Sequence, residues 1–227
     1  MPILRCCCLL AVSAGLLLRA DDAGTPPPPA PVAAAPRAAA PSPWNLDLRL
    51  GVGGLPGTST VKDKSTGVTT DVSRDGGGDI DLELIYVRAR PGALGFAVGG
   101  GVFAHSHRAD VQGNKPEVDA SGIEGQGALV YRFTRGFHIE APALVIALGS
   151  AKATKLGMAD SDQGGYASLG LQAGAYYSFR FGLQLGAEIG VMGWSATVKQ
   201  QNGTGGKDDL VYSGGGGYAN LRAGFRF

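Results

Sequence analysis

Cysteine is nearly absent from this 227-residue chain, and its three copies are consecutive, at Cys6, Cys7 and Cys8. All three fall in an N-terminal leader that we expect to be cleaved, which leaves the mature chain without cysteine. This excludes a disulfide framework, a thiolate metal site and a cysteine nucleophile. A lipid anchor does not fit either, because Leu4 and Arg5 precede the first cysteine and the apolar run follows it.

Long apolar runs are scarce too, and the clearest one is Leu9–Leu18. It is too short for a membrane-spanning helix, which needs about 20 residues. Arg5 before the run and the small residue Ala20 after it fit a signal peptide, which we place at residues 1–20. No later run approaches the length of a membrane-spanning helix, so none is expected.

An excess of one charge is also missing, with 20 Lys and Arg against 19 Asp and Glu. Loss of Arg5 and Arg19 with the leader keeps the chain close to neutral. Such a balance gives no electrostatic basis for binding nucleic acid.

Residues 21–43 contain mostly Pro and Ala. This composition buries little surface and favours extended polyproline geometry, so we interpret 21–43 as a linker. One domain remains, 44–227, which is long enough for a single barrel.

That domain repeats an alternation of large apolar side chains with small or polar ones. Successive side chains of a strand point to opposite faces, so each repeat predicts a strand with one apolar and one polar face. Each is near the roughly 9–11 residues that a tilted strand needs to cross a bilayer. The eight segments are 44–52, 79–86, 94–102, 123–133, 137–148, 167–177, 183–191 and 218–227.

The connections between these segments alternate between short and long. Short turns are predicted at 88–92, 134–136 and 180–182, and long polar loops at 56–78, 106–120, 150–165 and 197–209. Short turns at one end and long loops at the other are typical of transmembrane barrels.

The fifth segment breaks the alternation. Phe137 and Ile139 share one face, whereas Leu144, Ile146 and Leu148 fall on the other. A proline cannot donate a ladder hydrogen bond and is tolerated at bulges. We therefore predict a bulge near Ala141–Pro142 that returns the three later residues to the apolar face.

Aromatic residues gather near the short turns, as expected for rings at a membrane interface. They are Trp44, Tyr86, Tyr131, Phe133, Phe137, Tyr177, Phe179, Phe181, Phe225 and Phe227. A thinner second girdle is expected at the opposite end, from Phe103, Tyr166 and Trp194.

Charged residues occupy the polar face, where they would line a lumen. Facing hydrocarbon, a Lys or Arg would cost about 2–4 kcal/mol, whereas across a lumen opposite charges can pair. The predicted polar network of the lumen is Asp47, Arg49, Asp81, Glu83, Glu124, Arg132, Glu188 and Arg222, and Asp79, Glu140 and Arg226 share its face. Eight strands leave room only for side chains, so we expect a filled interior. The 38 glycines either make room for these side chains or, at Gly214–Gly217, form a mobile approach to the last strand.

Few residues suggest chemistry. His105 and His107 could form half of a metal site, but no third ligand stands at a defined spacing, and solvated rim residues are the simpler interpretation. His138, near a turn, is expected to form hydrogen bonds inside the lumen. No nucleophile motif is present, so we assign no catalytic, cofactor-binding or metal-ligating residue.

The domain 44–227 resembles the small eight-stranded bacterial outer-membrane β-barrels of the OmpA/OmpX-like type, through its architecture and through the motif of its last strand. In that motif, Leu221, Ala223, Phe225 and Phe227 resemble the C-terminal assembly signal of these barrels. The resemblance implies an all-β, antiparallel up-and-down transmembrane barrel in the outer membrane. Its partners would be outer-membrane lipids, the barrel-assembly machinery and periplasmic chaperones, and it would be a monomer.

We therefore expect a non-enzymatic protein with a structural or surface-contact role in the cell envelope. Two alternatives remain open at this stage. One is an outer-membrane enzyme that modifies lipids, and the other is a secreted soluble β-barrel that binds a small hydrophobic ligand.

Assembly should depend on the aromatic terminus. Deleting Phe227 is expected to lower the folded yield in cells more than a Phe181 substitution in a turn does, because Phe227 belongs to the signal-like motif. Folded protein in the membrane fraction is measured by heat-modifiable migration in detergent gels. Normal levels of the deletion variant would contradict a role for this terminus in assembly.

Overall fold

A computed structural model describes residues 44–110, 116–154, 161–201 and 205–227, all within one compact unit, Pro41–Phe227. The predicted signal peptide (1–20) and linker (21–43) lie outside the described residues. The strands are β1 (Trp44–Leu55), β2 (Thr60–Asp63), β3 (Thr69–Asp71), β4 (Ser73–Arg88), β5 (Ala93–Asp110), β6 (Glu117–Arg132), β7 (Phe137–Thr154), β8 (Asp162–Ser178), β9 (Leu183–Gln201) and β10 (Lys207–Arg226).

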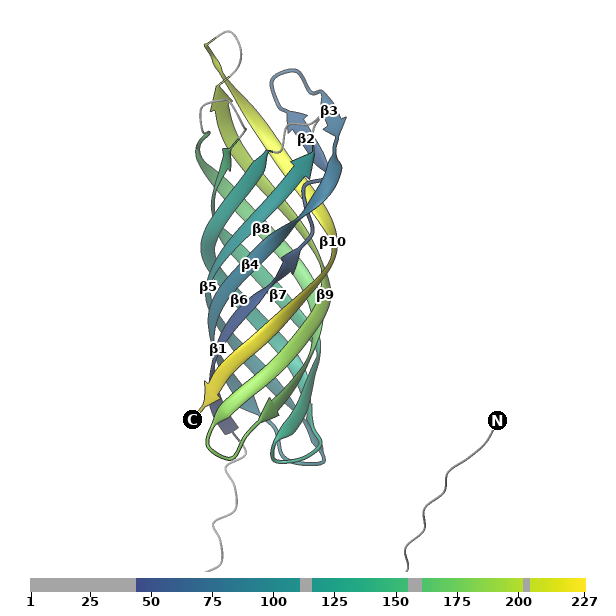
Figure 1. The fold of residues 1–227 in the computed structure, drawn as a ribbon, viewed down its shortest axis with the longest axis vertical. Coiled ribbons are helices and arrows are strands. Elements are labelled where there is room, and N and C mark those ends of the chain that lie inside the picture. The colour runs from purple at the N-terminus through teal and green to yellow at the C-terminus, as the bar shows by residue number, and fades with distance from the viewer. Residues whose placement is uncertain (1–43, 111–115, 155–160, 202–204) are drawn as a thin grey trace, which may run out of the picture. The chain divides into compact units, whose positions relative to one another are not determined.

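Eight of these strands form a closed antiparallel ring, in which β1 and then β4 to β10 pair in chain order (Figure 1). The ring closes where β1 pairs with β10, from Asp47 opposite Arg226 to Gly54 opposite Ala219. Beyond the last ladder residue, Phe227 exchanges two backbone hydrogen bonds with Leu46, at 2.9 and 3.4 Å. The predicted eight-stranded up-and-down barrel is confirmed.

A small hairpin, β2–β3, was not predicted, because 56–78 was interpreted as a loop. β2 pairs with β10, with Leu210 opposite Asp63 and Ser213 opposite Thr60. The Asp63 carboxylate accepts hydrogen bonds from the amide and hydroxyl of Ser65, which orders the tip of the hairpin. Gly67 completes the turn with a φ of 73°, a conformation that other residues rarely adopt.

Most strands run further than a bilayer crossing requires. About 9–11 residues suffice for a tilted strand, but β5 has 18 residues and β10 has 20. The extra length lies at the end opposite the short turns, which we call the loop end. There 106–108 and 117–119, expected as loop, pair with one another in β5 and β6. The connections at this end are longer, as expected, but much of their length is strand because the inward–outward alternation continues beyond the apolar band.

The outer face of the ring carries the large apolar side chains. Leu94, Val98 and Val102 of β5 are 74%, 51% and 55% exposed, whereas the charged Asp47 and Arg49 are fully buried in the interior. This is the reverse of a soluble protein, and it is the arrangement of a barrel whose exterior faces lipid. No described helix is long and apolar enough to cross a membrane. The closed ring, with its apolar exterior and charged interior, is an outer-membrane β-barrel that crosses the bilayer with eight strands.

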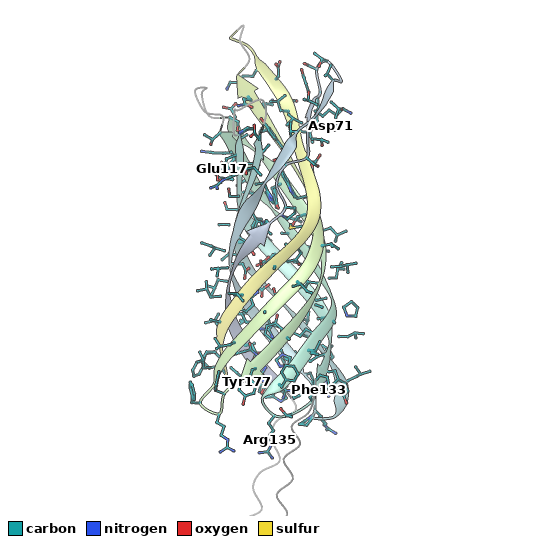
Figure 2. The ribbon with its side chains drawn as sticks, turned by 45° about the vertical axis from the view of Figure 1, so that its right-hand side comes forward. Asp71, Glu117, Phe133, Arg135 and Tyr177 are labelled. Atoms are coloured by element: carbon teal, nitrogen blue, oxygen red, sulfur yellow. The ribbon has the colours of Figure 1, made fainter. Side chains whose placement is uncertain are left out.

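An aromatic girdle surrounds the end with the short turns, which we call the turn end. Figure 2 shows Phe133 and Tyr177 there, and Asp71 and Glu117 at the loop end. Neighbouring rings contact one another, with Tyr131 and Phe133 centroids 4.7 Å apart. The predicted girdle at this end is confirmed.

The prediction of a second aromatic girdle at the loop end is wrong. Phe103, Tyr166 and Trp194 are each only 4% exposed, and they pack together inside the barrel. The reason is the strand extension, because Phe103 follows the outward Val102 and the alternation sends it inward.

The bulge predicted in the fifth segment is present in β7. Glu140 pairs with Val130 of β6, and Ala143 pairs with Ala128, so Ala141 and Pro142 together oppose one residue. The register with β8 shifts at the same place. As expected, Leu144, Ile146 and Leu148 are exposed on the outer face.

Glycines on the inner face make room for large side chains. An added Cβ at Gly186 would overlap the Tyr176 ring, and one at Gly190 would lie 2.7 Å from the Tyr218 ring. Of the two expected roles of glycine, this one is confirmed. Residues Gly214–Gly217 are ladder residues of β10, opposite β9.

Replacing Gly186 by Ala should destabilise the barrel by about 1–3 kcal/mol, because the buried Tyr176 ring has no free space to move into. The matched control is Gly127→Ala, where an added Cβ meets nothing within 4 Å. The free energy of unfolding of both variants is measured by urea titration in detergent. Equal stability of the two variants would contradict the packing described here.

Candidate functional site

Inward side chains fill the barrel in three groups, which follow one another from the turn end to the loop end. The lower network consists of Asp47, Arg49, His138, Glu140, Gln184 and Arg226. The middle network consists of Asp81, Glu83, Gln126, Gln172, Tyr176, Glu188, Tyr218 and Arg222. The aromatic layer consists of Phe103, His105, His107, Tyr166, Trp194 and Tyr212.

Arg49 is the centre of the lower network. Its guanidinium donates to both oxygens of Glu140, at 2.6 and 3.0 Å, and to Asp47 at 3.3 Å. Its Nε donates to Gln184, and its guanidinium carbon lies 4.0 Å from the centre of the Tyr176 ring. Arg49, on β1, therefore contacts side chains of β7, β8 and β9 as well as its own strand. Every charge near it has a partner, as a buried charge requires.

Two further contacts complete the lower network. Arg226 donates two hydrogen bonds of 2.8 Å to Asp47, which links β10 to β1 at the seam of the ring. His138 Nε2 lies 3.1 Å from a Glu140 oxygen, and the ring is fully buried. The expectation that His138 forms hydrogen bonds in the lumen is confirmed.

The middle network is centred on Arg222. Its Nη1 donates to Asp81, its Nε donates to Glu188 at 2.8 Å, and its Nη1 lies 3.7 Å from Glu83. Glu188 also accepts from the Tyr176 hydroxyl. The Arg222 guanidinium thus faces three carboxylates, two on β4 and one on β9.

A row of hydrogen bonds crosses the barrel beside Arg222. The Tyr218 hydroxyl donates to Gln172 at 2.5 Å, Gln172 donates to Gln126 at 3.1 Å, and Gln126 donates to Glu83 at 3.3 Å. The row joins β10, β8, β6 and β4. Because each amide accepts on one side and donates on the other, glutamines fit this row better than charged residues would.

Of the eight residues expected in the lumen network, six join the two networks: Asp47, Arg49, Asp81, Glu83, Glu188 and Arg222. Arg132 is buried apart from them, and the Asn45 amide oxygen lies 2.7 Å from its Nη2 when that amide is turned to accept. Glu124 faces the same interior, but it makes no hydrogen bond or ion pair with the described residues.

The predicted lumen network did not include the glutamines. It placed Glu140 on the same face but gave it no partner. Gln126, Gln172 and Gln184 stand at inward positions of their strands and are all buried. The alternation does place them on the polar faces of their strands, but the predicted network was drawn from charged residues alone.

The aromatic layer closes the loop end of the lumen. The ring of His107 stacks on Trp194, with centroids 3.9 Å apart and planes 17° apart. After β1, the chain turns inward, and Leu55–Thr58 is buried beneath the mouth of the barrel. His107 lies five residues beyond Val102, the last large apolar residue exposed on β5, so His107 is outside the membrane-spanning segments.

Hydrogen bonds assign the protons of the two histidines. His107 Nδ1 lies 2.8 Å from the carbonyl oxygen of Pro56, so it carries a proton, and burial lowers the pKa of His107 to about 4, which keeps the ring neutral near pH 7. Its Nε2 then accepts from the Tyr166 hydroxyl at 3.0 Å. The same hydroxyl oxygen accepts from His105 Nδ1 at 3.0 Å, and His105 Nε2 lies 3.0 Å from Asp79 Oδ1 with no hydrogen bond between them.

The expectation that His105 and His107 are solvated at the rim is therefore wrong. They are 7% and 0% exposed, and each ring nitrogen already has a polar neighbour. The strand extension explains this outcome as well, because both histidines occupy inward positions of β5.

No protein-family model and no curated protein matches the sequence. Among solved structures, the chain is similar to the attachment invasion locus protein Ail of Yersinia pestis, determined in complex with the heparin analogue sucrose octasulfate. The TM-score is 0.39 and the identity 16%, over 80% of this chain and 99% of that chain. It is also similar to the outer membrane protein OprG of Pseudomonas aeruginosa, with a TM-score of 0.46 and 14% identity, over 82% of this chain and 97% of that chain. The closed ring, apolar exterior and polar interior of this chain carry its assignment as an outer-membrane barrel.

Proposed function

We propose that this outer-membrane β-barrel is a non-enzymatic protein that supports the cell envelope and presents its loop end for contact with the surroundings. One observation carries the proposal: side chains fill the interior from the turn end to the loop end. A filled interior leaves no path for solutes, so the outer surfaces are where such a protein would act.

The loop end supports a contact role. Strands β5 to β10 and the hairpin β2–β3 extend to the loop end (Figure 1), where exposed outward residues such as Arg108, Asp119 and Lys152 are polar. Charges of both signs lie on this surface, and some are paired, as Lys207 with Asp162 at 2.7 Å and Arg108 with Glu117 at 3.1 Å. A surface of mixed charge favours contact with other proteins or with surface sugars over nucleic acid.

Assembly partners follow from the last strand. Leu221, Ala223, Phe225 and Phe227 are all exposed on the lipid face of β10. This supports their role as the signal that the barrel-assembly machinery reads, after periplasmic chaperones have delivered the chain. The ring has no open edge within the membrane, which favours a monomer surrounded by outer-membrane lipids.

A lipid-modifying enzyme would require an activated nucleophile at the rim. Among the described residues, no serine hydroxyl is hydrogen-bonded to a histidine, the arrangement that activates serine. A secreted soluble barrel does not agree with the apolar exterior, because its large outward side chains would face water.

Planar-bilayer recordings of the purified protein should show little or no steady conductance, because the three groups of side chains block the lumen. A general porin reconstituted in the same way serves as the positive control. Large, stable open levels from this protein would overturn the filled-lumen basis of the proposed function.

Orientation is tested by single cysteines, since the mature chain is expected to have none. Ser65→Cys, at the tip of the β2–β3 hairpin, should react with a membrane-impermeant maleimide on intact cells. Arg135→Cys, in an exposed turn at the opposite end (Figure 2), should react only after the outer membrane is permeabilised. The reverse result would place the loop end inside the cell envelope and contradict a surface-contact role.

A further inference from the structure

Negative charge is concentrated in the middle of the lumen. Five carboxylates lie there, at Asp79, Asp81, Glu83, Glu124 and Glu188, and the only arginine bonded to them among the described residues is Arg222. The lower network, by contrast, balances Asp47 and Glu140 with Arg49 and Arg226. Buried charges without compensation are strongly destabilising, so this excess requires a counter-charge or protonation of some of the carboxyl groups.

The hydrogen-bond and ion-pair partners of each carboxylate show which carboxylates lack compensation. Arg222 donates to Asp81 and Glu188, and Asp79 Oδ2 accepts from the Asn220 amide at 2.8 Å, but Asp79 Oδ1, 3.0 Å from His105 Nε2, has no hydrogen-bond partner. Glu83 and Glu124 have unpaired oxygens as well. Glu83 is 1% exposed and its Oε2 accepts from Gln126, but its Oε1 has no hydrogen-bond partner. Glu124 Oε1 has none either.

Glu83 and Glu124 lie close to each other and to Asp81. One carboxylate oxygen from each of Asp81, Glu83 and Glu124 falls within 4.8 Å of the other two. Asp81 and Glu124 also line an internal cavity of about 30 Å³. Roughly 10–15 Å³ is enough for one water molecule, so this space admits an ion or a water.

An independent observation comes from Asn220, on the same cavity wall. Asn220 is 4% exposed, and its Nδ2 donates to Asp79, which fixes the orientation of the amide. Its Oδ1 then has no donor. The Asn220 amide oxygen and one carboxylate oxygen of each of Asp79, Glu83 and Glu124 therefore lack a donor, and all of these residues except Glu83 line the same cavity.

We propose that the middle of the lumen binds a hard divalent cation, Ca²⁺, through the carboxylates of Asp81, Glu83 and Glu124. All three ligands are oxygens, which suits Ca²⁺ and disfavours softer metals that prefer nitrogen or sulfur. Water in the cavity would satisfy the orphan acceptors but would leave the excess charge in place. Protonation of Glu83 or Glu124 would remove that charge with no ion bound, and elemental analysis of the refolded protein separates the two cases. The site is independent of the proposed surface role, since it lies in the lumen and away from the outer surface.

The test uses full-length mature protein refolded in detergent without lipopolysaccharide, which itself binds divalent cations. Refolding with Ca²⁺, followed by removal of free ion, should leave a single equivalent of Ca²⁺ per chain by elemental analysis. Tb³⁺ in its place should show luminescence sensitised by Tyr218, which lines the same cavity. Glu124→Gln should weaken Ca²⁺ affinity by roughly tenfold or more.

The matched control is Glu117→Gln, which removes a carboxylate paired with Arg108 outside the lumen and should leave Ca²⁺ binding unchanged. Glu83→Gln replaces Glu124→Gln if the latter does not fold, and the wild-type measurement stands without either. Absence of bound Ca²⁺ and of Tb³⁺ luminescence in the wild-type protein would overturn the proposal. So would a Glu124→Gln variant that binds as tightly as the wild type, or a melting temperature that EDTA during refolding does not lower.

Discussion

The narrow interior of an eight-stranded ring is the constraint on which the rest of this structure depends. Only side chains fit inside, so each large inward residue needs a small neighbour and each inward charge needs a partner. Tyr176 lies in space that Gly186 leaves open, and Arg49 lies between Glu140 and Asp47. The high glycine content is therefore a packing requirement of the lumen.

The same constraint divides the lumen into regions of different chemistry. Ion pairs fill it at the turn end, a row of amides crosses the middle, and stacked rings close it at the loop end. The two ends of the lumen each leave a ring nitrogen without a partner, at His138 and Trp194, whereas the unpaired atoms near Glu83 and Glu124 are all acceptors.

Alternation in the sequence predicted the part of the fold that lies within the membrane. The eight strands, the outward apolar face and the bulge at Ala141–Pro142 all follow from a period of two and the chemistry of proline. Beyond the apolar band, the outward residues become polar, and the pattern resembles a loop. The hairpin β2–β3 and the buried positions of His105 and His107 were missed for that reason.

Pairing inside the lumen could not be predicted in the same way. The sequence places Arg49 and Glu140 on one face, but their contact depends on strand register and on the tilt of strands that are far apart in the chain. Neutral partners such as Gln172 and Gln184 give no signal in a search for charges. Which carboxylate lacks a partner, as Glu124 does, is known only after all others have been paired.

The seam between β1 and β10 has a consequence for the order of folding. Its pairs, from Leu46 with Phe227 to Gly54 with Ala219, join the two ends of the domain, so they close the longest possible loop of the chain. The entropy lost in closing such a loop is recovered only when the final residues are in place. Pairing of β1 with β10, which joins the residues farthest apart in the sequence, is thus the last step in forming the ring. A chain still being synthesised can form hairpins, but it cannot form the barrel.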